Sequence, residues 1–240
     1  MMSIKSKIEW TNASWNPIRG CTKISEGCKN CYAQTFAERF RGVPGHPYEQ
    51  GFDLRLVPKN IERPLNWKNP KKIFVCSMSD LFHEEVPIEY IIKVFETMNK
   101  ASWHTFQILT KRTERLLNIH SKLNWTSNIW IGTTIELEKY SYRSNIIAKI
   151  PATVRFLSLE PLLGPINNLP LNKIDWIIVG GESGLKARPM ELDWALKIKK
   201  ICKENQIPFF LKQLGGRKNK NGGNKAILEG QIWHQYPQVI

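Results

Sequence analysis

The stretch HTFQILTKRTERLLNIHSKLNWTSNIWIGTTIE, residues 104–136, decides the fold class of this chain. It opens with a β-branched and aromatic run, continues with a segment of helical period over 112–123, and returns to an apolar run that ends before Glu136. A strand–helix–strand order within about 30 residues is typical of a βα unit, whose two strands are parallel. The sequence therefore predicts an α/β protein.

The same alternation runs through the rest of the chain. Further strand-like runs are KKIFVCSMSD (71–80), TVRFLSLEP (153–161), DWIIVGGES (175–183) and IPFFLKQLGG (207–216), and further helical segments cover 87–101 and 191–205. Strands expected within 6–15 and 51–58 bring the number to eight. Eight successive βα units predict a single TIM-like (βα) barrel domain over residues 1–240, complete or partial. A doubly wound sheet is the alternative, but no Gly-rich phosphate-binding fingerprint follows the first strand.

Polar residues directly follow six of the apolar runs. These endings are Ser77–Asp80, Thr110–Arg112, Thr133–Glu136, Glu160, Gly180–Ser183 and Lys212–Gln213. In a TIM-like barrel the carboxyl ends of the strands meet at the face that carries the active site. We therefore expect a shared polar cavity, although polar residues also mark where strands simply stop. The candidates for catalytic residues are Asp80, Lys111, Arg112, Glu160 and Lys212.

Composition and charge narrow the class of protein. No apolar run approaches the roughly 18 to 20 residues of a bilayer span, and the N-terminal segment lacks the features of a signal peptide, so we expect a cytoplasmic protein without a membrane partner. Lys and Arg number 35 against 21 Asp and Glu, a net charge of +14. This excess favours a polyanionic partner, above all nucleic acid, although many basic proteins have no specific partner. Two basic clusters contribute to it: Lys59, Arg63, Lys68, Lys71 and Lys72, and Arg217, Lys218, Lys220 and Lys225.

Three of the five cysteines lie in the stretch GCTKISEGCKNCYAQ, residues 20–34, with the spacing Cys21-x6-Cys28-x2-Cys31. In a reducing compartment such a cluster indicates metal or redox chemistry rather than disulfides. Two cysteines separated by two residues can direct both sulfurs at one metal centre. The sequence therefore predicts that this stretch is a metal-binding loop after the first strand.

The three thiolates leave two kinds of metal centre open. A structural zinc ion needs a fourth ligand, for which His46, His83 and Cys76 are the candidates. A [4Fe-4S] cluster held by three cysteines leaves one iron open to a substrate or cofactor. Cys76 lies in an apolar run and Cys202 in an amphipathic helical segment, so we expect both in the core.

Several motifs of the chain, taken together, resemble one known family. They are WNPIRGCTKISEGCKNCYA, FVCSMSDLFHEEVP, LTKR, FLSLEPLLGPI, WIIVGGESG and FLKQLGG, in order from about residue 7 to residue 237. This series resembles the phage-associated three-Cys-motif family, a family of unknown function that is itself similar to a distant branch of the radical S-adenosylmethionine enzymes.

The resemblance implies a cofactor set and a reaction class. Cys21, Cys28 and Cys31 would hold a [4Fe-4S] cluster, and S-adenosylmethionine would bind its fourth iron and be cleaved to a radical that abstracts hydrogen from a substrate. The element Gly180-Gly181-Glu182-Ser183 would bind the amino group of S-adenosylmethionine. The chain departs from the usual pattern of those enzymes: six residues rather than three separate the first two cysteines, and the Gly-Gly-Glu element follows the seventh expected strand rather than the second.

Two main hypotheses about function follow. The first is an iron–sulfur enzyme of the radical S-adenosylmethionine type that acts on a nucleic acid or nucleotide. Such an enzyme needs an electron donor, and a second protein encoded in the same genome is a further candidate partner. The second is a zinc-binding, nucleic-acid-binding protein without catalysis, in which Trp10, Trp15 and Trp67 stack on bases. A zinc hydrolase is less favoured, because its open water site calls for His and carboxylate ligands rather than three thiolates.

Overall fold

The structure of the chain is a computed structural model, and it describes residues 6, 8–216 and 225–238. The chain folds as two compact units, residues 1–130 and residues 131–240. In the first unit the elements are β1 (Ala13–Trp15), β2 (Ile18–Arg19), α1 (Tyr32–Ala37), β3 (Arg55–Leu56), β4 (Lys72–Val75), α2 (Ile88–Lys100), β5 (Thr105–Thr110) and α3 (Thr113–Ile119). Short 3₁₀ turns cover Glu26–Cys28, Glu38–Phe40, Pro58–Asn60, Arg63–Asn66 and His120–Lys122.

The first unit is built on parallel strands that are buried. Trp15 of β1 pairs in register with Val75 of β4, and Val75 with Ile108 of β5, so these three side chains lie on one face. All three are at most 2% exposed. The apolar period of α2 supplies a buried stripe, which consists of Ile91, Val94, Phe95 and Met98. Burial of such side chains is worth about 1.5–3 kcal/mol each, so it outweighs the weak helix propensity of β-branched residues.

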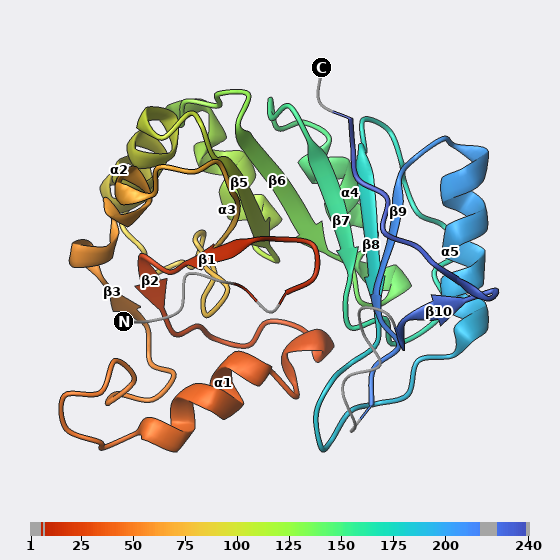
Figure 1. Ribbon diagram of the computed structural model, residues 1–240, viewed down its shortest axis with the longest axis horizontal. Helices are drawn as coiled ribbons and strands as arrows, with labels where there is room; N and C mark the ends of the chain where they lie inside the picture. The colour runs from red at the N-terminus through yellow and green to blue at the C-terminus, as the bar shows by residue number, and fades with distance from the viewer. Residues whose placement is uncertain (1–5, 7, 217–224, 239–240) are drawn as a thin grey trace. The chain divides into compact units, whose positions relative to one another are not determined.

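The second unit repeats this arrangement with longer strands. Its elements are β6 (Ile129–Thr134, whose first two residues belong to the first unit), α4 (Tyr142–Ile147), β7 (Arg155–Leu159), β8 (Trp176–Gly180), α5 (Leu192–Glu204), β9 (Phe209–Gln213), β10 (Ile227–Leu228) and β11 (Gln231–Ile232), with a 3₁₀ turn at Glu138–Tyr140. In Figure 1, β7, β8 and β9 lie side by side and α5 runs beside β9. Ala195, Ile198 and Cys202 form the buried stripe of α5.

The strand order is β1-β4-β5-β6-β7-β8-β9, and the pairings described in it are parallel. This confirms the predicted α/β class, and an order that ends at β1 and β9 is that of a partial rather than a closed barrel. The strand predicted within 51–58 is wrong as a member of the sheet. Only Arg55 and Leu56 are extended, and they pair antiparallel with β2. A two-residue, partly exposed strand lacks the apolar faces that a parallel sheet buries on both sides.

The predicted helices are confirmed with small changes at their ends. α2 and α5 fall within the segments 87–101 and 191–205, and α3 is shorter than predicted, because the chain turns into a 3₁₀ helix at His120. The six-residue α4 and the hairpin of β10 and β11 were not predicted, since neither is long enough to show a period. None of the helices in the described residues combines the length and the apolar character needed to cross a membrane.

Gly132 of β6 gives a test of the packing in the second unit. A Cβ atom at this position would lie 2.4 Å from the ring of Phe156, its partner in register on β7. Gly132→Ala should therefore lower the free energy of unfolding by about 1–3 kcal/mol, the usual cost of overpacking a core. Gly164→Ala is the matched control, since its Cβ would meet only the end of the Leu137 side chain, at 3.1 Å. Denaturant unfolding that shows equal losses for both variants would contradict this account.

Candidate functional site

The cysteine loop, residues 20–34, follows β1 and β2 in the first unit and is anchored at its start by backbone contacts. The Gly20 N–H donates to the carbonyl of Met78 (3.1 Å), and the Cys21 N–H donates to the carbonyl of Phe52 (3.2 Å). Gly20 has φ +78°, and a Cβ atom on it would lie 2.1 Å from the carbonyl oxygen of Asp53. Glycine is therefore required here by both conformation and space.

Two of the sequence motifs are joined by hydrogen bonds at this anchor. Asn16 Oδ1 accepts from the Met78 N–H (3.1 Å), and the Ser79 hydroxyl donates to the carbonyl of Ile18 (2.9 Å). These bonds tie the segment WNPIRGC to the segment SMSD that follows β4. The turn after β4 thus fixes the place where the cysteine loop begins.

The structure describes all three loop cysteines as free thiols that are half-buried. Cys28 ends the 3₁₀ turn Glu26–Cys28, and Cys31 precedes α1, where its carbonyl accepts from the Thr35 N–H at 3.0 Å. Cys21 and Cys31 both pack against one small apolar cluster, which consists of Ala33, Ala37, Tyr48 and Phe52. The loop therefore brings its first and last cysteine to the same patch of core.

Two cations act on two of these thiols. Burial raises the pKa of Cys28, but the charge of Lys111 and hydrogen bonds from the backbone of Ile24 and Ser25 outweigh it, so the pKa lies below the usual value. Burial and the nearby Asp80 carboxylate raise the pKa of Cys21 to about 12, against the opposing effect of Arg112. The guanidinium Nη1 of Arg112 lies 3.6 Å from Cys21 Sγ, within range of an N–H···S hydrogen bond.

Asp80 and Arg112, both predicted as catalytic candidates, form a buried ion pair with 3.2 Å between Asp80 Oδ2 and Arg112 Nη1. The Asp80 carboxylate also accepts from the Thr110 hydroxyl (2.8 Å) and from the backbone N–H groups of Phe82 (3.0 Å) and Lys111 (3.2 Å). A carboxylate with this many donors is held in one orientation. The pair thus contacts the start of the cysteine loop, and a catalytic role for either residue stays a prediction from the sequence.

His83 completes the network beneath the loop. Its Nδ1 accepts from the Glu85 N–H (3.2 Å), so the neutral ring carries its proton on Nε2, which lies 2.9 Å from the Thr22 hydroxyl and donates to it. Burial and the charge of Arg112 lower the pKa of His83. Both ring nitrogens are therefore engaged within the protein.

The other candidates for a fourth zinc ligand also pack within the first unit. The ring of His46 stacks on Phe40 at 3.8 Å and its Nδ1 accepts from the Tyr48 N–H, while Cys76 is 3% exposed in the core, as predicted. Trp10 and Trp15 were wrongly predicted as stacking platforms for bases, because each is 2% exposed and packs inside the first unit. In the part of the chain that the structure describes, no three His, Cys, Asp or Glu side chains are placed as a metal-binding group.

The second unit holds the remaining predicted site residues at the carboxyl ends of its strands. Lys212 Nζ lies 3.0 Å from Glu160 Oε1, and the Ser158 hydroxyl donates to Glu160 Oε2 at 3.1 Å. Oε1 is buried, and its charge is paired with the ammonium of Lys212. Gly180 makes room for this carboxylate, since a Cβ atom there would lie 2.4 Å from Oε1.

The Gly-Gly-Glu element lies against the end of β9. The Gly181 N–H donates to the Gln213 carbonyl, the Gln213 side-chain amide donates to the Gly181 carbonyl, and Ser183 forms a parallel bridge with Gly216. A Cβ atom on Gly181 would lie 2.4 Å from the Leu214 carbonyl oxygen, which explains why glycine stands here. The motifs GGES and QLGG are thus one structural feature.

Glu182, predicted to bind the amino group of a cofactor, is paired within the protein. Arg188 Nη2 lies 2.5 Å from Glu182 Oε1, and both Nε and the backbone N–H of Arg188 donate to Oε2 at 2.9 Å. This ion pair was not predicted, because a separation of six positions in the sequence does not mark two residues as partners.

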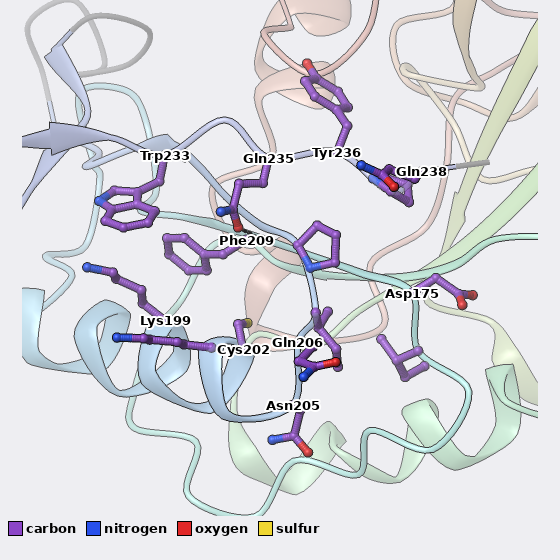
Figure 2. Close-up of a pocket in the computed structure, with 15 residues that line it drawn as sticks. Asp175, Lys199, Cys202, Asn205, Gln206, Phe209, Trp233, Gln235, Tyr236 and Gln238 are labelled. Carbon is purple, nitrogen blue, oxygen red and sulfur yellow. Dashed lines mark hydrogen bonds between the residues drawn. The ribbon is translucent and has the colours of Figure 1, made fainter. Parts of the chain in front are cut away.

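The second unit also contains a pocket of about 980 Å³ near the start of β9 and the end of α5, shown in Figure 2. Lys199 and Cys202 from α5 and Trp233, Gln235 and Tyr236 from the segment after β11 are among its lining residues. None of the residues predicted for the site lines it. The second basic cluster of the sequence falls largely on residues 217–224, outside the described residues.

Gly20 provides the first test of the site. Gly20→Ala should cost about 1–2 kcal/mol for the left-handed conformation and at least about 1 kcal/mol more for the collision with the Asp53 carbonyl. Gly42→Ala is the matched control, since Gly42 has the same φ of +78° but no atom within 4 Å of the added Cβ. The measurement is the free energy of unfolding of each variant, and a cost at Gly20 no greater than that at Gly42 would show that the loop is not anchored there.

The buried imidazole of His83 predicts a pH dependence of stability. Because its pKa is lowered in the folded state, the unfolded chain takes up a proton at this position below about pH 6.5 that the folded chain does not. The free energy of unfolding should then fall as the pH drops from about 7 to 5, and His83→Gln should show a smaller fall over this range. Identical pH profiles of wild type and variant would contradict a neutral, buried His83.

Comparison with known proteins gives one match to a family and one solved structure. No curated protein matches the chain. The solved structure is a spore photoproduct lyase mutant with bound AdoMet and dinucleoside spore photoproduct, at 10% sequence identity and a TM-score of 0.49, with 73% of this chain and 57% of that chain covered. This chain thus spans little more than half the length of that protein. The family model covers residues 5–237, and the chain therefore belongs to the family described as Protein of unknown function (DUF5131).

Proposed function

We propose that this chain is an iron–sulfur enzyme of the radical S-adenosylmethionine type, in which Cys21, Cys28 and Cys31 hold a [4Fe-4S] cluster. The observation that carries the proposal is the cysteine loop itself. Three free thiols stand on one loop next to the parallel strands of an α/β unit, and the cations of Lys111 and Arg112 act on two of them. All three thiols are half-buried rather than fully buried, and the structure describes each of them as free.

The donor set fits such a cluster by its chemistry. Iron–sulfur clusters are bound by thiolates, and a nearby cation favours the thiolate form. Lys111 has this effect on Cys28, and Arg112 opposes the rise in the pKa of Cys21. The three sulfurs as they stand are not one coordination group, so the fit rests on the kind and number of ligands and on the charges around them.

Each residue of the network has a distinct role in this proposal. When bound, a reduced [4Fe-4S] cluster supplies one electron to the sulfonium group of S-adenosylmethionine. The chain itself contributes the anchored loop start at Gly20, the thiolate-favouring charges of Lys111 and Arg112, and the Asp80 carboxylate that orients Arg112.

The binding of S-adenosylmethionine by Gly180, Gly181, Glu182 and Ser183 stays a prediction from the family resemblance. Glu182 is already paired with Arg188, so a cofactor ammonium would have to exchange with that guanidinium or share the carboxylate with it. Glu160 is the other acidic candidate, and there too a cofactor ammonium would have to replace or share a cation, because Glu160 Oε1 is paired with Lys212 at 3.0 Å.

The substrate class is the least constrained part of the proposal. A nucleic acid or nucleotide is favoured by the net charge of +14. The electron donor, a partner protein and an association with phages stay predictions from the sequence.

The proposal is tested by iron content after anaerobic reconstitution. Replacement of Cys21, Cys28 or Cys31 by Ala should abolish iron binding and the brown colour of the protein, because each removes one of only three ligands. Cys202→Ala is the matched control, since Cys202 lies on the buried face of α5 and is only 1% exposed. The reduced wild type should also convert S-adenosylmethionine to 5′-deoxyadenosine.

Two results would overturn the proposal. A colourless protein that binds zinc would favour the non-catalytic alternative, and equal iron content in the wild type and all four variants would remove the cysteine loop from the assignment.

A further inference from the structure

Arg112 is buried directly beneath the cysteine loop, and its side chain is only 3% exposed. It lies between β5 and α3, so its backbone position is set by the end of a core strand. Its Nη1 lies 3.6 Å from Cys21 Sγ and its Nη2 lies 3.2 Å from the carbonyl oxygen of Thr22. Arg112 therefore contacts both the first cysteine and the residue that follows it.

The guanidinium is held from all sides by acceptors. Nη1 also donates to Asp80, Nε donates to Glu84 at 2.7 Å, and Nη2 also donates to the Thr22 hydroxyl at 3.0 Å. A planar guanidinium with this many acceptors cannot rotate without breaking several hydrogen bonds at once. The N–H group that faces Cys21 is thus fixed in place before any metal arrives.

Hydrogen bonds to sulfur and the net charge nearby are two factors that set the reduction potential of an iron–sulfur cluster. Reduction adds a negative charge, so a donor or a positive charge at a ligating sulfur favours the reduced form. The side chains of Arg112, Asp80 and Glu84 together carry a net charge of −1. Removing the charge of Arg112 changes this net charge to −2, and removing the charge of Glu84 changes it to 0.

We infer that Arg112 is a positioning residue that binds the Cys21 sulfur and raises the reduction potential of the cluster. This inference rests on the proposed function, since it concerns a cluster on the loop. It adds that Arg112, which is not a ligand, makes the cluster easier to reduce against the opposing charges of Asp80 and Glu84.

The experiment measures the midpoint potential of the reconstituted cluster by a redox titration followed by electron paramagnetic resonance. Arg112→Gln should bind iron but make reduction about tenfold less favourable, which is a fall of about 59 mV for one electron. Arg115→Gln is the matched control, because it also removes one positive charge but from a residue that donates to the carbonyl of Val86. This variant should leave the midpoint potential unchanged.

Glu84→Gln gives a second test of opposite sign that does not depend on a core substitution. Glu84 is 60% exposed, so this variant should fold, and the loss of its negative charge should raise the potential by a smaller amount. If Arg112→Gln does not fold, an unchanged or lower potential in Glu84→Gln overturns the inference. A folded Arg112→Gln with the potential of the Arg115→Gln control overturns it as well.

The outcomes separate this inference from the proposed function. A wild-type protein that takes up no iron refutes the proposed function and the inference together. A wild-type protein with a cluster, whose potential does not respond to Arg112→Gln or Glu84→Gln, refutes the inference alone.

Discussion

The carboxylate of Asp80 is the constraint on which the first unit depends. It accepts hydrogen bonds from the end of β5, from the turn after β4 and from the guanidinium beneath the cysteine loop. Breaking such a buried pair by removal of one partner usually costs about 3–5 kcal/mol, because the other charge stays buried without compensation. One side chain therefore fixes three segments that are far apart in the sequence, and the position of the first cysteine follows from them.

Both units use close backbone contact beyond the ends of their strands. In the first unit Gly20 fits against the carbonyl of Asp53, and in the second Gly181 fits against the carbonyl of Leu214. At each place the added methyl group of alanine would collide with backbone atoms, which cannot move as a flexible side chain can. The glycines of both motifs therefore have a steric explanation that holds whatever ligand the chain binds.

The sequence predicted the strands and helices that are long enough to show a regular pattern of apolar residues. Buried strands such as β5 and β8 and the apolar stripes of α2 and α5 follow from hydrophobic period alone, because burial dominates their energetics. The two-residue β3 was placed in the wrong sheet, since a run of two strand residues carries no information about its partner.

The polar residues that follow the strands could be read from the sequence, but the contacts between them could not. Asp80, Arg112, Glu160 and Lys212 were singled out because they follow strands, and the structure joins them as two ion pairs. Pairing depends on side-chain direction and on distances between segments, which spacing in the sequence does not encode. For the same reason, the sequence did not predict the ion pair of Arg188 with Glu182 or the hydrogen bond of His83 with Thr22.

The anchoring of the cysteine loop at its two ends has a consequence for its length. Gly20 to Thr22 are fixed by the turn after β4 and by Arg112, and Cys31 is fixed by α1, whereas Lys23, Ile24 and Glu26 between them are exposed to solvent. The closure entropy of a flexible loop changes by only about 0.6 kcal/mol for each doubling of its length. Six rather than three residues between the first two cysteines therefore cost the fold little, so a chain can lengthen this segment and still present its first and last thiols at the same place.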